Sequence, residues 1–288
     1  MIIDVHNHPE WHCHTVEKFI ENMDKNEIDI TWLLTWESPL NEYSHEQFAS
    51  IPHYEKYGPI PFSKVIEYVK QFPTRFVPGY APDPRRPEAI DLLCGAINMY
   101  GVRVYGELKL RMMYDNLDAI RMFRFCGEKN LPVVVHIDYE FETQTRYPRP
   151  SWWYGGGIEA LERAVSKCPD TIFLGHGPGF WSHISGDDKF DKEMYPSGEV
   201  KQGGKIIEML MRYKNLYCDL SAGSGLNALK RDVNFAKKFL VEFQDRILFA
   251  RDYFDSNHRE FLDSLGLDSE TLRKIYSGNA LKIVPLKL

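Results

Sequence analysis

Two histidines near the start of the chain have the spacing of metal ligands. His6 and His8 form a His-Asn-His segment that directly follows a short apolar run. Side chains at positions i and i+2 of an extended chain point to the same side, so both imidazoles can approach one ion. An isolated His-x-His segment is a weak signal. Its position at the end of a predicted strand makes the metal-binding interpretation stronger.

Three further polar residues end apolar runs in the same way. His136 ends Val-Val-Val-His, His176 ends Ile-Phe-Leu-Gly-His, and Asp252 ends Ile-Leu-Phe-Ala-Arg-Asp. A single histidine after an apolar run is more often a hydrogen-bonded core residue. Burying several such groups without partners would cost on the order of several kcal/mol, whereas a shared divalent cation would be a partner for all of them. Imidazole nitrogens with carboxylates favour zinc, with manganese or iron as alternatives, and leave open one or two ions.

Glu107 is a further candidate ligand, in the segment Gly-Glu-Leu-Lys-Leu. It could bridge a second metal ion, or it could pair with Lys109 or Arg111. Lys109 falls on the same side of the predicted strand as Glu107 by the period of two. We favour the ligand interpretation.

The segment His12-Cys13-His14 repeats the His-x-His spacing in a different setting. It falls in a predicted loop, where no strand fixes the direction of its side chains. Thr15 follows as a possible N-cap of the first helix. We therefore predict that this segment lies at the rim of a pocket.

These residues need a scaffold that brings strand ends together, and the chain alternates short apolar runs with helical stretches. The predicted strands are Ile2–His6, Ile28–Thr35, Phe76–Tyr80, Val102–Leu110, Val133–Ile137, Thr171–Gly175, Leu216–Leu220 and Ile247–Ala250. Eight parallel strands, each followed by a helix, close most naturally into a (β/α)8 TIM barrel. An open doubly wound sheet is the alternative, but no glycine-rich nucleotide-binding segment follows the first strand. We predict one domain over residues 1–288.

Helical periodicity is clearest in four stretches, and three long insertions follow strands. The helical stretches are Phe62–Phe72, Ile158–Lys167, Ile206–Tyr213 and Leu226–Phe243, and the insertions are 37–60, 138–157 and 177–202. In a barrel of this kind, the loops that follow the strands form the catalytic face.

Composition excludes several classes of protein. Hydrophobic residues at 43% and charged residues at 26% are typical of a globular chain with a large core. No apolar run approaches the roughly 18–20 residues of a membrane span. The net charge of −6 disfavours binding to nucleic acid. Five dispersed cysteines, without a C-x-x-C pair, and a start that lacks a signal peptide predict reduced thiols in the cytoplasm.

The ordered set of strand-end ligands resembles the amidohydrolase superfamily of metal-dependent barrels. His6 and His8 follow strand one, His136 strand five, His176 strand six and Asp252 strand eight. The late segments Leu-Tyr-Cys-Asp-Leu-Ser (216–221), Ile-Leu-Phe-Ala-Arg-Asp-Tyr (247–253) and Ser-Gly-Asn-Ala-Leu-Lys-Ile (277–283) are similar to the amidohydrolase 2 branch. The likeness spans nearly the entire chain.

The resemblance implies a role for each matching residue. His6, His8 and Asp252 would bind a first metal ion, and His136 would bind that ion or help to hold a second. His176 would bind the second ion or act as an acid–electrostatic group. Glu107 resembles the bridging glutamate of TatD-like enzymes, whereas many members of the amidohydrolase 2 branch have a lysine-containing segment there. Arg251 also departs from the usual Gly-Thr/Ser-Asp pattern and places a cation beside Asp252.

Two reactions are compatible with these residues. The first, which we favour, is hydrolysis of an amide, lactone or ester, in which Asp252 takes the proton of a metal-activated water and His176 stabilises the oxyanion. The alternative is non-oxidative decarboxylation of an unsaturated or aromatic acid. A metal-stabilised binding protein without turnover is a third, non-catalytic class. The predicted partner is a small-molecule substrate, and a homo-oligomer is compatible with the sequence.

Substrate contacts are predicted from cations and aromatic residues near the strand ends. The arginines in the set could grip a carboxylate, and the tryptophans could form walls around a planar ring. Alternatively, the cations are solvated and the aromatic side chains seal a loop. The candidates are Lys109, Arg111, Arg146, Arg149, Trp152, Trp153 and Trp181.

Overall fold

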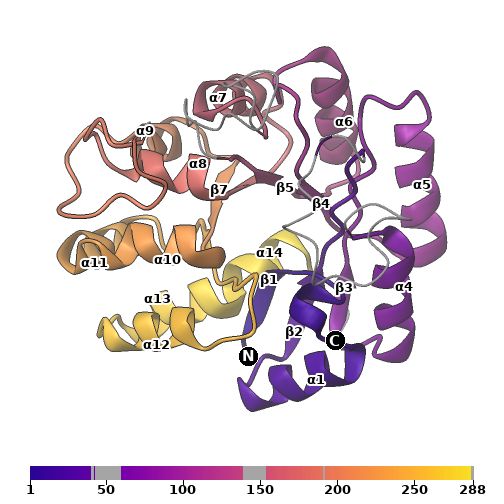
Figure 1. Cartoon of the computed structure of the whole chain (residues 1–288), viewed down its shortest axis with the longest axis horizontal. Coiled ribbons are helices and arrows are strands. Elements are labelled where there is room, and N and C mark those ends of the chain that lie inside the picture. Colours follow the sequence, from indigo (N-terminus) through magenta and orange to yellow (C-terminus); the bar gives the residue numbers. More distant parts are fainter. Residues whose placement is uncertain (40–41, 43–59, 139–153, 191, 287–288) are drawn as a thin grey trace.

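Eight parallel strands form the centre of the molecule, and helices surround them (Figure 1). The computed structural model describes residues 1–39, 42, 60–138, 154–190 and 192–286. The strands are β1 (Ile3–Asn7), β2 (Ile30–Leu33), β3 (Phe76–Pro78), β4 (Tyr105–Leu108), β5 (Val133–His136), β6 (Phe173–His176), β7 (Leu216–Asp219) and β8 (Ile247–Leu248). Each overlaps a predicted strand, although the ends differ by one to several residues.

Backbone hydrogen bonds join the two parts of the sheet into a barrel. The strands pair in the orders β1-β2-β3 and β4-β5-β6-β7-β8. Between β3 and β4, the N–H of Tyr80 donates to the carbonyl of Val104 at 3.0 Å. Between β8 and β1, the N–H of Val5 donates to the carbonyl of Phe249 at 3.1 Å. The predicted (β/α)8 TIM barrel is thus confirmed.

Most connections between strands carry an amphipathic helix that buries one face against the barrel. In the first helix, Val16, Phe19 and Met23 are buried, and the side chain of Thr15 caps its start as predicted. The helices are α1 (Val16–Lys25), α4 (Phe62–Gln71), α5 (Ala89–Tyr100), α6 (Leu117–Glu128), α7 (Ile158–Lys167), α8 (Pro178–Trp181), α9 (Lys205–Arg212), α10 (Ala222–Lys230), α11 (Val233–Glu242), α12 (Asn257–Ser264), α13 (Ser269–Arg273) and α14 (Asn279–Ile283). None of these helices, nor any other in the described part of the chain, combines the length and apolar character needed to cross a bilayer.

One predicted helical stretch is in fact two helices. The prediction of continuous helix over Leu226–Phe243 is wrong, because α10 ends at Lys230 and α11 begins at Val233. The carboxylate of Asp232 accepts a hydrogen bond from the N–H of Phe235 at 3.0 Å and caps the second helix. Asp is a strong N-cap residue, so the break is encoded locally.

The predicted insertions differ in how much of them the structure describes. The segment 177–202 contains α8 and the short 3-10 helix Ser182–Ile184. Most of 37–60 and 138–157 lies outside the described residues, together with His45 and His53. His183, in the 3-10 helix, and His258, in α12, are both buried.

Alternate residues of the strands fill the barrel interior with apolar side chains. Val134 of β5, Leu174 of β6, Tyr217 of β7 and Leu248 of β8 belong to one buried cluster, against which Ala280 of α14 packs. Two residues further along their strands, the same side carries His136, His176 and Asp219, which the period of two places above the interior apolar layer. The barrel interior therefore changes from apolar to ionisable at the carboxyl ends of the strands.

The register shifts in β1 and β4, at the strands that supply His6 and Glu107. The pairing of β1 with β2 is irregular between Asp4 and Asn7, and the pairing of β4 with β5 is irregular between Tyr105 and Leu108. Such irregularities re-aim the side chains that follow them. Val104 belongs to the interior apolar cluster, so strict alternation from it would put Glu107, three residues later, on the outer face of the barrel; the shift between Tyr105 and Leu108 turns Glu107 inward.

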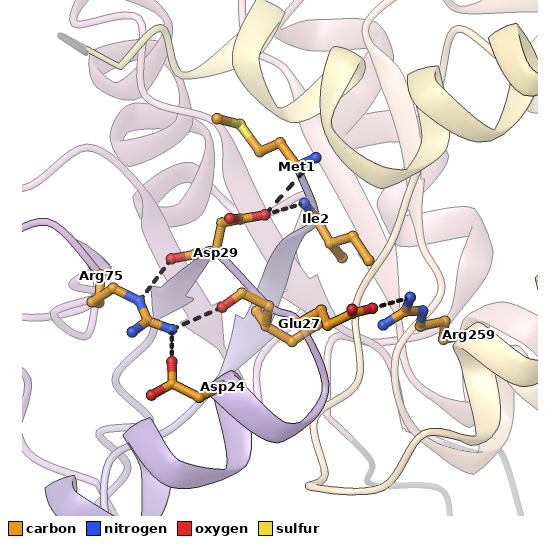
Figure 2. Close-up of a pocket in the computed structure, with 8 residues that line it drawn as sticks. Met1, Ile2, Asp24, Glu27, Asp29, Arg75 and Arg259 are labelled. Atoms are coloured by element: carbon orange, nitrogen blue, oxygen red, sulfur yellow. Dashed lines mark hydrogen bonds and ion pairs between the residues drawn. The ribbon is translucent and has the colours of Figure 1, made fainter.

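Charged residues line a pocket of about 690 Å³ beside the amino ends of β1 and β2 (Figure 2). Arg75 contacts Asp24 at 2.8 Å and donates to the carbonyl of Asp29 at 2.9 Å. Arg259 pairs with Glu27. Because these charged side chains already have partners, we interpret them as a network that stabilises the amino end of the barrel.

A buried ion pair joins β1 to the segment that follows β8. The Nε of Arg251 donates to the Oδ2 of Asp4 at 2.8 Å, and its backbone N–H donates to Oδ1 at 2.9 Å. Arg251 is only 1% exposed and Asp4 is fully buried. The guanidinium thus has its carboxylate partner on β1, although it adjoins Asp252 in the sequence.

Arg251→Met is expected to lower the free energy of unfolding by about 3–5 kcal/mol, because Asp4 would be left buried and unpaired. Urea unfolding of the metal-free protein measures the change. Lys201→Met, which removes the exposed pair of Lys201 with Glu199, is the control and should cost about 0–1 kcal/mol. Equal stability of the two variants would contradict the structural role of the Asp4–Arg251 pair.

Candidate metal centre

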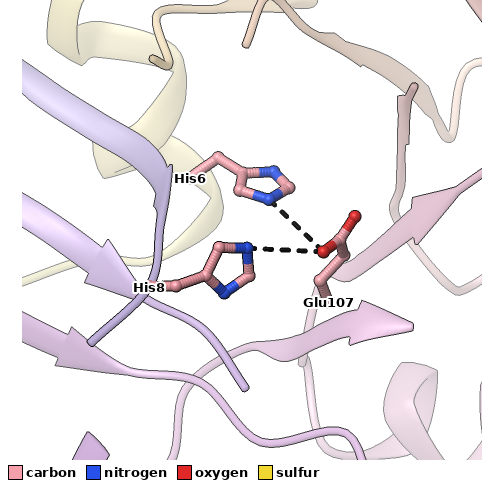
Figure 3. Close-up of side chains that lie close together, drawn as sticks. All are labelled: His6, His8 and Glu107. Atoms are coloured by element: carbon pink, nitrogen blue, oxygen red, sulfur yellow. Dashed lines mark ion pairs between the residues drawn. The ribbon is translucent and has the colours of Figure 1, made fainter. Parts of the chain in front are cut away.

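The predicted ligands converge at the carboxyl end of the barrel. His6 and His8 lie at the end of β1, and their rings point toward Glu107 of β4 (Figure 3). His136 ends β5 and His176 ends β6, and their ring centroids are 5.1 Å apart. His6 lies beside His176, with a centroid separation of 4.3 Å.

Glu107 stands between two pairs of histidines. Its Oε2 lies 3.4 Å from the Nε2 of His8 and 3.8 Å from the Nε2 of His6. Its Oε1 lies 2.8 Å from the Nδ1 of His136 and 3.7 Å from the Nε2 of His176. The two oxygens of one carboxylate therefore face two separate groups of potential ligands.

Asp252 lies beside His8 at the same end of the barrel. Its Oδ1 lies 3.6 Å from the Nε2 of His8. The backbone of Asp252 is left-handed, with φ of 57°, which is uncommon for a residue other than glycine. Two hydrogen bonds hold this backbone in place. The N–H of Asp252 donates to the carbonyl of His6 at 2.9 Å, and the indole N–H of Trp11 donates to the carbonyl of Asp252 at 2.7 Å.

Each of three histidines has a hydrogen-bond partner on its outer nitrogen. The Nδ1 of His6 lies 2.6 Å from the Oδ2 of Asp219, and the Nδ1 of His8 lies 3.0 Å from the carbonyl of Leu34. The Nδ1 of His176 lies 2.7 Å from the Oγ of Ser221. Contacts of this kind orient imidazoles that bind metals, and they leave Nε2 toward the centre.

Burial and mutual contact shift the pKa values of these groups. Burial raises the pKa of Asp252 to about 6. Burial opposes ionisation of Asp219 as well, but the adjacent His6 and His176 lower its pKa to about 2. Burial also opposes ionisation of Glu107, yet the contact with His136 and the other histidines holds its pKa well below 4.5. Contact with the histidines thus keeps Glu107 and Asp219 ionised in a buried site.

The donor set fits a divalent cation. Three overlapping groups have ligand atoms within 4.8 Å of one another: His6, His8 and Glu107; His6, His176 and Asp252; and Glu107, His136 and His176. The buried Nε2 of His6 and Oδ1 of Asp252 have no hydrogen-bond partner among the residues that the structure describes. Buried polar atoms are rarely left without a partner, and a cation would satisfy both.

The predicted substrate-binding residues divide into three cases. The Nζ of Lys109 lies 3.9 Å from the centroid of the Trp36 ring, and the guanidinium carbon of Arg111 lies 5.5 Å from that of Tyr154. Both are cation–π distances. Trp181 is 1% exposed, and its indole donates to the carbonyl of Asp219 at 3.0 Å, a position that favours support of β7 over contact with substrate.

The remaining substrate-binding predictions, Trp152, Trp153, Arg146 and Arg149, lie outside the described residues.

The second His-x-His segment lies apart from the ligand groups. The ring of His12 lies 5.1 Å from Tyr253, and the ring of His14 stacks on Phe254 at 3.5 Å. Neither histidine belongs to a group of potential ligands within the described part of the chain.

Asp219 is the site residue that the sequence reasoning did not assign. It ends the run Leu-Tyr-Cys-Asp of β7, which is the same pattern that identified His136 and His176. The signal was therefore present in the sequence. Ser221 gave no signal of its own, because serine after a strand is common.

Comparisons with known proteins relate this geometry to one family. The profile of the amidohydrolase family matches residues 3–286. The sequence matches no curated protein. Among solved structures, an uncharacterised TIM-barrel protein from Bordetella bronchiseptica superposes with a TM-score of 0.64 at 17% identity, covering 98% of this chain and 97% of the other.

Two further solved structures carry an activity in their names. A dihydroxybenzoic acid decarboxylase from a Polaromonas species, with bound manganese and the inhibitor 2-nitroresorcinol, has a TM-score of 0.61 at 16% identity and covers 98% of this chain and 96% of its own. A probable 2-pyrone-4,6-dicarboxylic acid hydrolase from Acinetobacter baumannii, with bound citric acid, has a TM-score of 0.57 at 11% identity and covers 98% of both chains. At these identities the likeness concerns the fold alone.

Proposed function

The chain belongs to the amidohydrolase family, and from this premise we propose that it is a metal-dependent hydrolase of a small carbonyl compound, an amide, lactone or ester. The observation that carries the proposal is the position of Glu107. Its two oxygens face different histidine pairs, as a carboxylate shared between two ions would. Two-ion sites are typical of hydrolytic enzymes, so Glu107 favours hydrolysis over decarboxylation.

The ligands fall into two sets that share Glu107. His6, His8 and Asp252 would hold the first ion, and His136 and His176 would hold the second. When bound, a divalent ion lowers the pKa of a coordinated water to about 7 and polarises a carbonyl oxygen. Zinc suits this mixture of nitrogen and oxygen ligands, and manganese is the alternative that a structural relative contains.

The residues of the chain then have distinct tasks. Asp252, with one oxygen lacking a hydrogen-bond partner among the described residues, is placed to accept a proton from a water in the centre and to return it to the leaving group. If the centre binds one ion instead of two, Nε2 of His176 would be left to stabilise negative charge that develops on the substrate. Lys109, held over the Trp36 ring, would contact an anionic part of the substrate.

Non-oxidative decarboxylation is the second candidate. Decarboxylases, one of them with bound manganese, are among the solved structures that share this fold, so the fold is compatible with this reaction. Lys109 also makes no ion pair with a carboxylate in the part of the chain that the structure describes, so it is available for an acid. A metal-stabilised binding protein remains the non-catalytic alternative.

Parallel assays separate the candidates. Proton release from a panel of lactones, amides, esters and phosphoesters tests hydrolysis, and carbon dioxide release from aromatic and dienoic acids tests decarboxylation. Turnover of the first panel alone supports the proposal. Turnover of the second panel alone would replace it, and metal binding without turnover on either panel would leave the binding protein.

Removal of the metal is expected to abolish activity. Dialysis against a chelator should lower turnover by at least about 10³, because a bound ion contributes several kcal/mol to stabilisation of the transition state. Addition of zinc or manganese should restore it, and elemental analysis gives the number of ions per chain. Full activity in a protein shown to be metal-free would contradict the proposal.

A further inference from the structure

The end of β7 contacts one histidine from each of the two ligand sets. Asp219 contacts His6, and Ser221 contacts His176. All four residues are buried. Asp219, the last residue of β7, and Ser221, two residues later, are therefore placed to orient the histidines of the centre from outside it.

Asp219 is oriented by two further contacts. The backbone N–H of Ser221 donates to its Oδ1 at 2.8 Å, and the indole of Trp181 donates to its backbone carbonyl at 3.0 Å. Its Oδ2 is left to accept from the Nδ1 of His6. The carboxylate has an acceptor role toward both neighbours.

We propose that Asp219 is a positioning residue of the metal centre, which keeps the proton of His6 on Nδ1 and thereby leaves Nε2 as the ligand atom. This inference rests on the proposed function, because it concerns the same centre. Ser221, whose backbone N–H is held by the same carboxylate, orients the ring of His176 through its Oγ. The end of β7 thus orients one histidine in each ligand set and sets the proton position of His6.

The Nε2 positions agree with this role. The Nε2 of His6 lies 3.8 Å from the Oε2 of Glu107 and lacks a hydrogen-bond partner among the residues described. The Nε2 of His176 lies 3.7 Å from the Oε1 of Glu107. In each ring Nδ1 contacts Asp219 or Ser221, and Nε2 points toward Glu107.

The substitution Asp219→Asn separates positioning from packing, because it keeps the shape of the side chain but leaves one acceptor oxygen in place of two. The backbone N–H of Ser221 and the Nδ1–H of His6 each need an acceptor. The backbone N–H of Ser221 cannot change its proton, whereas the ring of His6 can. The amide oxygen will therefore serve Ser221, and the amide NH2 will face the Nδ1 of His6. That ring must then carry its proton on Nε2, where it blocks metal binding.

Asp219→Asn is expected to weaken binding of the first zinc ion by about 10–100-fold, the usual effect of losing such an outer partner. Competition with a chromophoric chelator measures the affinity in the full-length protein. The second readout is the proton on the Nδ1 of His6, which should give a downfield NMR resonance in the metal-free wild type and lose it in the variant. Cys218→Ala, a neighbouring change on β7, is the control and should retain both properties.

Ser221→Ala provides an independent test should Asp219→Asn fail to fold. It should weaken the second zinc ion by about 10-fold and leave the His6 resonance in place, because the backbone N–H that orients Asp219 remains. Zinc affinities of both variants within threefold of wild type would overturn the inference. If the wild type itself binds no zinc, the proposed function fails, while the NMR comparison still tests the positioning of His6.

Discussion

Asp252→Asn is expected to lower kcat by about 10²–10⁴-fold, the range found when a group that transfers protons is removed. The amide cannot accept a proton from water, although it can still fill the space of the carboxylate. The left-handed backbone is compatible with asparagine, which adopts this conformation more readily than most residues. The fold should therefore survive the change.

Steady-state kinetics with the zinc-loaded variant measures the effect, and thermal unfolding checks the fold. Asp255→Asn is the matched control: Asp255 is exposed, three residues away, and its side chain accepts from the N–H of Asn257. The control should keep wild-type turnover. An Asp252→Asn enzyme that retains more than a tenth of wild-type kcat would show that another group takes the proton.

Glu107→Gln is expected to leave one ion fewer per chain and to reduce turnover by about 10³, since a bound ion contributes several kcal/mol. The glutamine amide presents one oxygen and one NH2. Only one of the two ligand sets therefore keeps an oxygen ligand at this position, and the other faces the NH2. The loss of negative charge weakens the remaining set as well.

Elemental analysis of the variant, after loading with zinc and removal of unbound metal, gives the stoichiometry. Glu162→Gln makes the same chemical change on α7, where Glu162 pairs with Lys205, and should retain the wild-type metal content. Full metal content in Glu107→Gln would show that Glu107 is no shared ligand, and the choice between hydrolysis and decarboxylation would then rest on the assays alone.

The strand-end residues could be predicted because a repeated local pattern carries long-range information. Val-Val-Val-His and Phe-Leu-Gly-His each predict a buried strand that ends in a polar group, and a parallel barrel collects such ends at one face. His136 and His176 lie together for this reason. The same rule applied to Leu-Tyr-Cys-Asp would have found Asp219.

Other features depend on tertiary contacts that no local pattern contains. The register shift in β4 decides that Glu107 faces the histidines, whereas alternation along the strand predicts only that it shares a side with Lys109. Arg251 is adjacent to Asp252 in the sequence, but its partner is Asp4, which lies 247 positions away. His258 stands in a polar stretch of sequence that gives no sign of burial, but in α12 its Nε2 lies 3.0 Å from the carbonyl of Ala222.

The candidate ligands come both from the end of β1 and from the segment that follows β8, so they are synthesised at very different times. A ribosome that adds about 5–20 residues per second needs roughly 12–50 s to travel from His6 to Asp252. Throughout that interval the amino-terminal imidazoles exist without the Asp252 carboxylate. If Asp252 completes the first ligand set, as we propose, the nascent polypeptide would acquire its full complement of metal only after the segment that follows β8 has emerged and docked.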